Sequence, residues 1–392
     1  MEFLKLRTVR LLPKLRRWIW TDGGANHLPA RSASSGSGLQ ALALALNKRL
    51  ADDAGRNNSN LVFSPSSVYA ALSLVAAGAR ERTLTEMLGV LGSRSQDELA
   101  RSVRALAEQA LADQSQTGGP RVNFACAVWH DKTRPLKPDY IDAAVKSYKA
   151  RTGAVDFHEK PEEAAEQINA WVATLTNDLI PSIVDPSELS RLTDLVVANA
   201  IYFKGKWGKP FDQRLTKEDK FHRLDGSTVD VPFMQDGNRQ LIACHHGFKV
   251  LQLYYQRGRP CPLSRGRATR FGDFRVPKFK LEFSTRLSGH LQELGLKDAF
   301  DPGKADLSDM AEGPGRSLTL QDVLHKAVIE VNEEGTEATA VTYGKGMVGC
   351  AQGYRRPPRV DFVADHPFAF FVREEVSGAI LFAGHVLDPS ME

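Results

Sequence analysis

Residues 327–349 read AVIEVNEEGTEATAVTYGKGMVG, and this stretch decides how the whole chain is interpreted. It begins with an apolar run typical of a strand, and a second such run follows at residues 362–372. The connection, residues 335–360, has about 25 residues without a helical or buried pattern, which is long for a compact domain. Loops of this length are usually functional or disordered, so this segment is the first candidate for function.

The residues of this segment alternate in size. Successive residues of a strand face opposite sides, so an alternating segment can bury a small face against a close layer. An exposed loop that is patterned as a strand indicates two states, and the alternative is a flexible loop with chance alternation. The small, uncharged set is Thr336, Ala338, Ala340, Thr342, Gly344 and Gly346, and the charged or bulky set is Glu337, Thr339, Val341, Tyr343, Lys345 and Met347.

The composition excludes several classes of protein. Of 392 residues, 42% are hydrophobic and 25% charged, as in ordinary globular proteins. The net charge of +4 gives no general reason to expect a nucleic-acid or membrane-surface partner. No apolar run reaches the roughly 18 residues that a membrane helix needs. The 4 cysteines are too scattered for a disulfide scaffold.

Residues 1–38 differ from the remainder in being basic and then serine-rich. An arginine-rich, acid-poor start is typical of an organelle transit peptide, but Pro13 interrupts any amphipathic helix. We interpret this segment as a basic, flexible extension, with organelle targeting as the alternative. There is no clear secretory signal, so the location is left open between cytosolic and extracellular.

From residue 39 onward the pattern is that of a folded domain. Residues 39–50 and 68–77 predict helices, with Pro65 starting the second, and residues 61–63 predict a short strand. The mixture lacks the regular alternation of a parallel α/β fold, so we expect the α+β class. Further strands are expected at residues 122–127, 195–203, 274–283, 327–332, 368–372 and 380–386.

Enzyme and cofactor motifs are absent from the sequence. It contains no GxSxG, HExxH or GxxxxGK[ST]. Residues 344–349 match GxGxxG, but the following CAQGYRRPP cannot start the helix that a dinucleotide site requires. Cys244, His245 and His246 suggest a metal, yet three adjacent residues cannot readily converge on one ion. We interpret them as a polar strand or turn, and expect no catalytic residue, cofactor or metal.

Residues 330–338 (EVNEEGTEA) resemble the loop hinge of the serpin family, most closely its plant members. Residues 361–368 (DFVADHPF) resemble the strand that follows the serpin reactive loop. Each match is weak alone, and their order along the chain makes the set specific. Further matches, in sequence order, lie at residues 60–67, 78–79, 168–180, 199–207, 277–280 and 294–296.

The resemblance implies a serpin fold, which is an α+β fold with a large mixed β-sheet, surrounding helices and an exposed reactive-centre loop. It places one serpin domain at residues 39–392, with the reactive loop at residues 335–359. Serpins are suicide inhibitors of serine, and sometimes cysteine, proteases: the protease forms an acyl-enzyme and the cut loop inserts as a new strand. The implied partner is a target endopeptidase in a covalent complex with a monomer. The alternative is a non-inhibitory serpin-fold binding protein or a decayed copy.

The resemblance also implies site residues. Counting from Gly335 puts the reactive bond at Gly349–Cys350, whereas counting back from Asp361 favours Cys350–Ala351. Glycine before the bond argues for a protease with a small or undemanding pocket. The implied hinge residues are Glu334, Gly335, Thr336, Glu337, Ala338, Thr339 and Ala340. The implied sheet-opening cluster has Ser64, Ser67, Asn199 and His325 beneath the opening of the sheet, and Trp207 at the site of first insertion.

The chain departs from the family near residues 254–273, where the family carries core strands and short helices. Here the segment is shortened, and residues 254–270 contain five arginines but no acidic residue. A deleted exon or a misjoined gene model is our interpretation, and a basic anion-binding loop is the alternative. Loss of a core strand would remove a few kcal/mol, a large share of a domain's stability.

Overall fold

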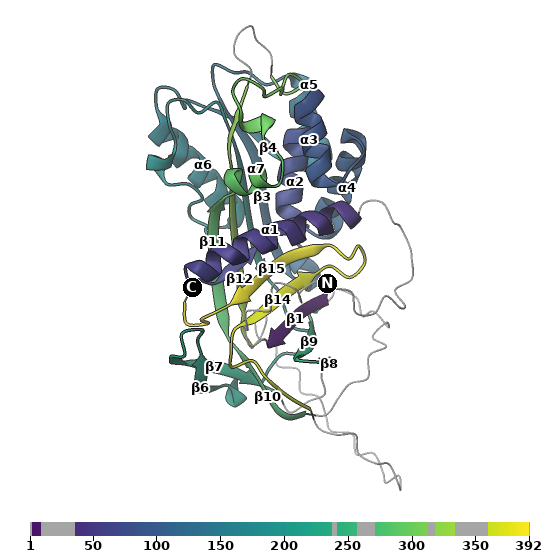
Figure 1. Cartoon of the computed structure of the whole chain (residues 1–392), viewed down its shortest axis with the longest axis vertical. Coiled ribbons are helices and arrows are strands. Elements are labelled where there is room, and N and C mark those ends of the chain that lie inside the picture. The colour runs from purple at the N-terminus through teal and green to yellow at the C-terminus, as the bar shows by residue number, and fades with distance from the viewer. Residues whose placement is uncertain are drawn as a thin grey trace.

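The computed structural model describes residues 2–8, 36–236, 241–256, 271–311, 318–333 and 360–391, with the backbone alone for residues 2–8, 36, 37 and 271. A five-stranded sheet runs along the long axis of the molecule (Figure 1). Its pairs are antiparallel except β12 with β5 and β3 with β4, which are parallel. Its strands, in spatial order, are β11 (Phe279–Arg286), β12 (Leu320–Val331), β5 (Leu195–Lys204), β3 (Arg121–Asp131) and β4 (Arg151–Val155).

Both faces of this sheet are covered, which is why β5 is buried at nearly every position. Alternate residues of β5 point to different layers. Val196 and Ala198 pack in a core with helix α6 (Pro161–Thr176), whereas Val197 and Ile201 belong to a core with helix α2 (Pro65–Ala76). Helix α2 is buried along its whole length and therefore lies at the centre of the molecule.

Two further sheets, of six and four strands, complete the β structure of the described residues. The first, in spatial order, has β2 (Leu61–Phe63), β15 (Ile380–Val386), β14 (Phe368–Arg373), β1 (Glu2–Thr8), β9 (Phe248–Tyr254) and β8 (Leu241–His245). The second has β13 (Val360–Val363), β10 (Phe271–Pro277), β7 (Thr228–Gln235) and β6 (Lys217–His222).

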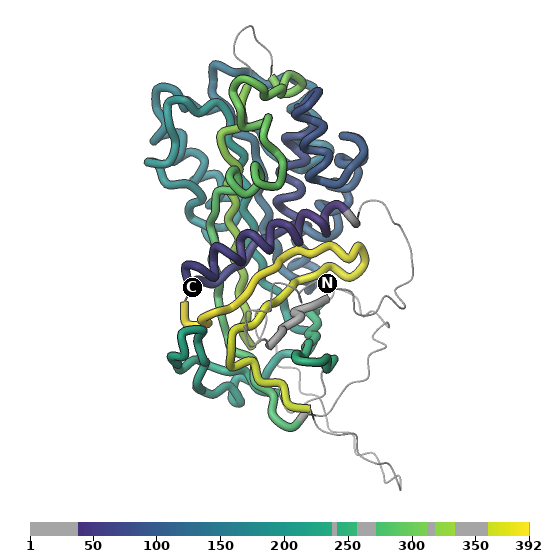
Figure 2. Tube along the Cα trace, viewed as in Figure 1, coloured from purple at the N-terminus to yellow at the C-terminus, as the bar shows by residue number. Residues whose placement is uncertain are grey.

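The remaining helices gather mainly at one end of the molecule, as the chain trace in Figure 2 makes clear. Among the described residues, no helix has the length and apolar character needed to cross a membrane. These helices are α1 (Gly36–Arg56), α3 (Glu81–Leu91), α4 (Gln96–Gln109), α5 (Pro138–Tyr148) and α7 (Ser288–Glu293). Single 3₁₀ turns lie at Ser115–Thr117, Pro186–Glu188, Gln213–Leu215 and Asp298–Phe300.

The predicted α+β class and most of the predicted strands are confirmed, with one strand divided. The run at residues 274–283 forms β10 and β11, which belong to different sheets. Lys278 separates the two strands, and its N–H donates to Pro232 O of β7 at 2.9 Å. Strands β6 to β9 were not predicted.

Two elements begin within residues 1–38, the segment that we expect to be a flexible extension. Residues Glu2–Thr8 form strand β1, and helix α1 already begins at Gly36. Strand β1 has an apolar residue at alternate positions, Leu4 and Leu6, which suits a sheet despite the basic composition of the segment.

Candidate functional site

The four residues expected beneath the opening of the main sheet form one buried cluster. Ser64 caps helix α2, where its Oγ accepts a hydrogen bond from Ser67 N–H at 3.2 Å. Ser67 Oγ donates to Asn199 Oδ1 at 2.8 Å, and Asn199 Nδ2 donates to Ser67 O at 3.2 Å. His325 lies opposite Asn199 in the ladder between β5 and β12. The cluster therefore joins α2 to both strands.

The contacts of His325 define its proton state. Nδ1 donates to Asn199 Oδ1 at 2.8 Å, and Nε2 accepts from Ser64 N–H at 3.1 Å. Because a backbone N–H cannot accept, Nε2 must be unprotonated and the ring neutral. Burial lowers the pKa of His325 to about 3, in agreement with this geometry. Protonation would place two donors face to face between α2 and β12.

Cys126 extends the cluster to a third strand, and sequence reasoning missed it. It lies opposite Asn199 in the ladder between β3 and β5. Burial raises the pKa of Cys126 to about 12, although a hydrogen bond with Asn199 acts in the opposite direction. Cys126 is therefore a neutral core thiol, and its position in the middle of an apolar strand run gave no sign of this contact.

Trp207, which was expected at the site of first insertion, lies just beyond the end of β5. Its Nε1 donates to Asn332 O at 2.7 Å, just beyond the end of β12. Its ring stacks on Tyr255 with centroids 4.3 Å apart, and a Cβ on Gly205 would lie 2.3 Å from the same tyrosine ring. Trp207 therefore holds the chain where it leaves β12. It takes no part in the hydrogen bonds of the polar cluster described above.

Glu333, the last residue described before the expected hinge, is anchored by side chains that the sequence did not indicate. Its carboxylate accepts from Thr216 Oγ1 at 2.7 Å and pairs with Lys278 Nζ at 3.0 Å. Burial alone would raise the pKa of Glu333, but these hydrogen bonds outweigh burial and lower it. Phe211 N–H donates to Glu333 O at 2.8 Å. The chain just before the expected hinge is thus fixed by contacts with Thr216, Lys278 and Phe211.

Side chains also hold the adjacent ends of β5 and β12 together. Lys204 Nζ lies 3.0 Å from Glu330 Oε1, and Tyr202 OH donates to Glu330 Oε2 at 3.3 Å. Each contact crosses from one strand to the other. Separation of the two strands at this end therefore breaks both contacts in addition to the backbone ladder.

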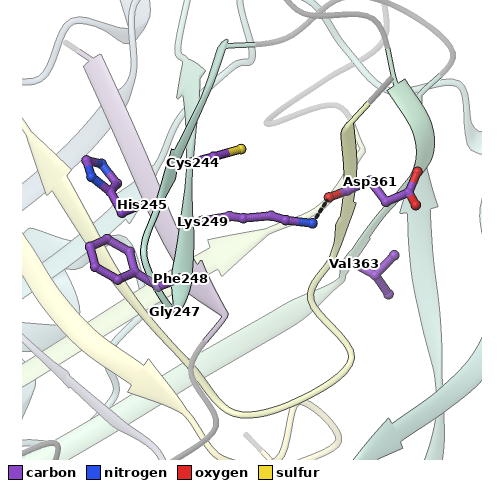
Figure 3. A pocket seen from close by; sticks show the side chains of 7 residues that line it. All are labelled: Cys244, His245, Gly247, Phe248, Lys249, Asp361 and Val363. Atoms are coloured by element: carbon purple, nitrogen blue, oxygen red, sulfur yellow. Dashed lines mark hydrogen bonds between the residues drawn. The ribbon is translucent and has the colours of Figure 1, made fainter. Parts of the chain in front are cut away.

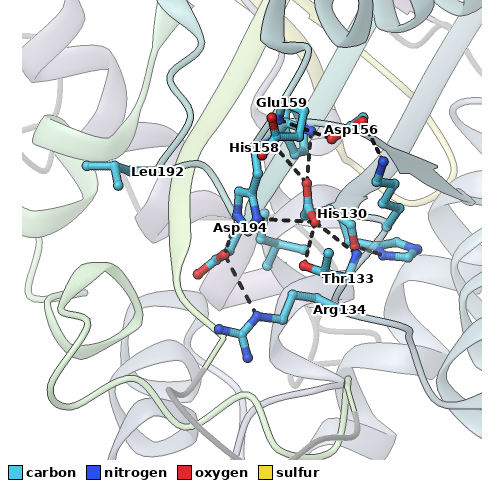
Figure 4. Close-up of polar contacts among 12 residues, drawn as sticks. His130, Thr133, Arg134, Asp156, His158, Glu159, Leu192 and Asp194 are labelled. Carbon is cyan, nitrogen blue, oxygen red and sulfur yellow. Dashed lines mark hydrogen bonds and ion pairs between the residues drawn. The ribbon is translucent and has the colours of Figure 1, made fainter.

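A second polar network lies at the opposite end of β5 (Figure 4). The carboxylate of Asp131 is fully buried and accepts from Phe157 N–H at 2.9 Å and Thr133 Oγ1 at 2.6 Å. Burial alone would raise the pKa of Asp131, but its hydrogen bonds lower it. His158 Nε2 lies 3.1 Å from Asp194 Oδ1. The network fixes the chain segments that precede α6 and β5.

The segment between α6 and β5 is also tied to the neighbouring strands. Gln321 Oε1 accepts from Asp194 N–H at 3.0 Å and from Leu195 N–H at 2.8 Å. Arg286, at the end of β11, donates to Glu188 O at 3.0 Å. Leu192 projects from this segment, as Figure 4 shows, and its side chain is exposed (74%). The contacts of Gln321 and Arg286 join the segment to β12 and β11.

The expected hinge residues, from Glu334 to Ala340, lie outside the described residues. So do Gly349, Cys350 and Ala351, the candidates for the reactive bond. The structure does place the two flanks of the loop. One is Glu333 beside the main sheet, and the other is β13, which pairs in parallel with β10.

Beside β13, a surface pocket of about 440 Å³ is lined by Cys244, His245, Gly247, Phe248, Lys249, Asp361 and Val363 (Figure 3). Lys249 Nζ donates to Asp361 O across it. His245 ends β8 and Gly247 makes the turn to β9, as the polar strand or turn interpretation predicted. Within the described residues, no group of histidine, cysteine and carboxylate side chains is arranged to hold a metal.

Comparisons with known proteins agree with this architecture. A family model described as "Serpin (serine protease inhibitor)" matches residues 37–261 and 263–389. The family is one of protease inhibitors and not of enzymes. The chain belongs to the serpin family.

Plant serpins are among the most similar relatives. The chain is 49% identical to Putative serpin-Z5 of Oryza sativa subsp. japonica over 410 residues, covering 92% of each chain. It is 46% identical to Serpin-Z2A of the same organism, over 92% of this chain and 98% of the relative. The structure of Arabidopsis AtSerpin1, described as a native stressed conformation, matches with a TM-score of 0.79 and 33% identity, covering 90% of this chain and 99% of that one.

Proposed function

We propose that this serpin inhibits a serine or cysteine endopeptidase as an irreversible suicide substrate, with residues 335–359 as its reactive loop. One observation carries the proposal: β5 and β12 are paired directly and in parallel. A chain that leaves the end of β12 and folds back beside it runs antiparallel to β12, and therefore antiparallel to β5 as well. Insertion thus replaces one parallel ladder by two antiparallel ladders, and antiparallel pairing is slightly more stable per residue.

The loop has the length and pattern that this insertion needs. Residues 336–346 alternate between small and larger residues, and they span a length close to that of β5, with 10 residues, and of β12, with 12. Both faces of the sheet are already packed, so an entering strand must present small side chains to the crowded layer. The relative AtSerpin1 has been solved in a native stressed conformation, which is the kind of starting state that this mechanism requires.

The chemical step follows from the family mechanism. The nucleophile of the protease, a serine hydroxyl or a cysteine thiolate, attacks the carbonyl carbon of Gly349. The bond from Gly349 to Cys350 breaks, the amine of Cys350 leaves with a proton, and an acyl-enzyme remains at Gly349. Loop insertion then carries the acylated protease away before water can release it. Cys350–Ala351 is the alternative reactive bond.

Separation of β5 from β12 requires specific side-chain contacts to break. At the loop end these are the Lys204–Glu330 pair and the Tyr202 hydrogen bond to Glu330. Further in, the His325 Nδ1 to Asn199 Oδ1 bond crosses from β12 to β5. Each hydrogen bond contributes about 1 kcal/mol net, so the closed sheet is held by a few kcal/mol beyond its backbone ladder.

The direct test is incubation of the purified protein with trypsin-, chymotrypsin-, elastase-, subtilisin- and papain-like proteases. Denaturing gels combined with mass spectrometry would then detect a covalent complex and the released peptide. We expect a complex with at least one protease and a peptide that begins at Cys350 or Ala351. Loop cleavage without a complex for every protease would contradict inhibition and favour the non-inhibitory alternative.

A further inference from the structure

Strand β1 lies outside the part of the chain that the serpin family model matches, yet it forms part of a sheet whose neighbouring strands the model does match. It lies between β14 and β9 and pairs antiparallel with both (Figure 1). Both neighbours fall within the residues matched by the family model, whereas Glu2–Thr8 fall outside them, since the match begins at residue 37. A segment without a counterpart in the family model therefore occupies an interior position of the six-stranded sheet.

The register of β1 matches the burial of its neighbours. Leu4 lies opposite Leu253 of β9 and Val372 of β14, both of which are buried. Arg7 lies opposite Val250 and Ala369, both of which are partly exposed. A one-residue shift of β1 along β14 would place Leu4 opposite partly exposed residues and Arg7 opposite buried ones. The sequence of β1 therefore favours the observed register.

Leu6 also lies opposite a buried residue of β9. It lies opposite Leu251, which is buried, and the next residue along, Lys5, lies opposite Gln252, which is partly exposed. Leu4 and Leu6 thus take ladder positions beside buried residues, and Lys5 and Arg7 take positions beside partly exposed ones.

Without β1, the sheet would have a gap. β14 and β9 would each present a row of unpaired backbone groups, which is unfavourable and invites wrong pairing. The gap agrees with the shortened segment predicted near residues 254–273, which directly follows β9. In addition, the alignment with Putative serpin-Z5 runs over 410 residues, more than the 392 of this chain, so the relative has residues that this chain lacks.

We propose that β9 and β14 form a strand-binding slot, and that residues 2–8 of the same chain fill it as a permanent part of the folded protein. The segment would complete the sheet in place of the strand that the shortened middle does not supply. The interpretation as a removable transit peptide is then excluded for the functional protein, because its removal would reopen the sheet.

A disulfide trap tests the slot and the register together. In a background with Cys126, Cys244, Cys261 and Cys350 replaced by alanine, Lys5→Cys is combined with Gln252→Cys. Directly opposite residues of an antiparallel pair have Cα atoms about 4.5–5.5 Å apart, within disulfide range. The control combines Lys5→Cys with Val250→Cys, which keeps the same face but is offset by two residues, or about 7 Å along the strand.

We expect mild oxidation to cross-link the Lys5/Gln252 variant within one chain, and to leave the offset variant reduced, as read by mass spectrometry of tryptic peptides. Equal cross-linking of both variants, or none in the first, would overturn the proposal. A disulfide between two chains would also overturn it, because the slot would then be filled by a second copy.

A stability measurement on the full chain gives an independent check. Leu4→Asp places a charge at a ladder position between buried residues, so we expect the thermal midpoint to fall by about 5 °C or more. Arg7→Asp, on the opposite face of the same strand, should change the midpoint by less than about 2 °C. Equal midpoints for the two variants would show that the strand does not sit in the slot as assigned.

Discussion

Nδ1 of His325 lies 2.8 Å from Oδ1 of Asn199, and this single hydrogen bond crosses the line along which the main sheet would open. On the other side of the ring, Nε2 accepts from Ser64 N–H, so the imidazole links β5, β12 and α2 only while it is neutral. The proton state of one side chain therefore affects both the stability of the fold and the closure of the sheet.

The first prediction concerns pH. Burial lowers the pKa of His325 from 6.5 to about 3, so between these values the unfolded chain binds a proton that the folded protein does not. The free energy of unfolding should therefore be independent of this group above about pH 6.5, and should fall by roughly 1.4 kcal/mol per pH unit below it. Urea unfolding at pH 7.5, 6.0 and 5.0 measures this slope.

His325→Gln is the matched variant for this prediction. We expect it to be less stable at pH 7.5, because the links to Ser64 and Asn199 are weakened, but to lose less stability on acidification. His385, whose pKa burial lowers to about 4, stays in place and should keep part of the slope. An unchanged slope in the variant would mean that His325 is not the titrating group.

The second prediction concerns the hinge. Thr336 belongs to the small set of alternating residues and Glu337 to the other set, so Thr336→Arg should block insertion whereas Glu337→Arg should not. We expect Thr336→Arg to be cleaved by the target protease with at least a tenfold loss of covalent complex on gels. If both variants form complex equally well, residues 336–346 do not insert in the proposed register.

The third prediction concerns the closing contact between β5 and β12. Lys204→Met removes the ion pair with Glu330, which is partly buried and worth about 1 kcal/mol at most. A synthetic peptide of residues 335–348 should then anneal into the sheet up to about fivefold faster, as followed on native gels. Lys220→Met, which breaks an exposed pair with Asp230 in another sheet, should leave the rate unchanged. A slower rate in Lys204→Met would contradict this role.

The fourth prediction compares two tryptophans. Trp207→Phe keeps an aromatic ring beside Tyr255 but removes the donor to Asn332 O, so we expect a loss of about 1–2 kcal/mol in urea unfolding. Trp129 is buried, and its Nε1 has no hydrogen-bond partner in the part of the chain that the structure describes. Trp129→Phe should therefore lose less stability than Trp207→Phe. The reverse order would show that the Trp207 hydrogen bond does not hold the end of β12.

The features that could be predicted from the sequence are those that depend on the pattern of neighbouring residues. Apolar runs located β2, β5, β14 and β15, and the Ser64-Pro65 pair located the start of α2, because burial and capping act on neighbouring residues. The contacts of Trp207 with Asn332 could not be predicted in this way, since the two residues are 125 positions apart. The same holds for the anchor of Glu333 and for the salt bridge from Lys204 to Glu330.

The polar cluster shows a different limit of prediction from the sequence. The resemblance to serpins assigned Ser64, Ser67, Asn199 and His325 together, but no spacing rule shows which nitrogen of the imidazole carries its proton. Only the contacts on both sides of the ring define it. Strand β1 was missed because its basic composition is typical of a tail, while its partners β9 and β14 lie hundreds of residues away.

The direct pairing of β5 with β12 also determines the stoichiometry of inhibition under the proposed mechanism. A new strand can enter between them only once, because both ladder edges are occupied afterwards. Under the proposed mechanism, each molecule thus removes at most one protease molecule and is not regenerated. Inhibition then works as a titration with a threshold: free protease appears only when it outnumbers the inhibitor, and the rate of inhibitor synthesis determines that threshold.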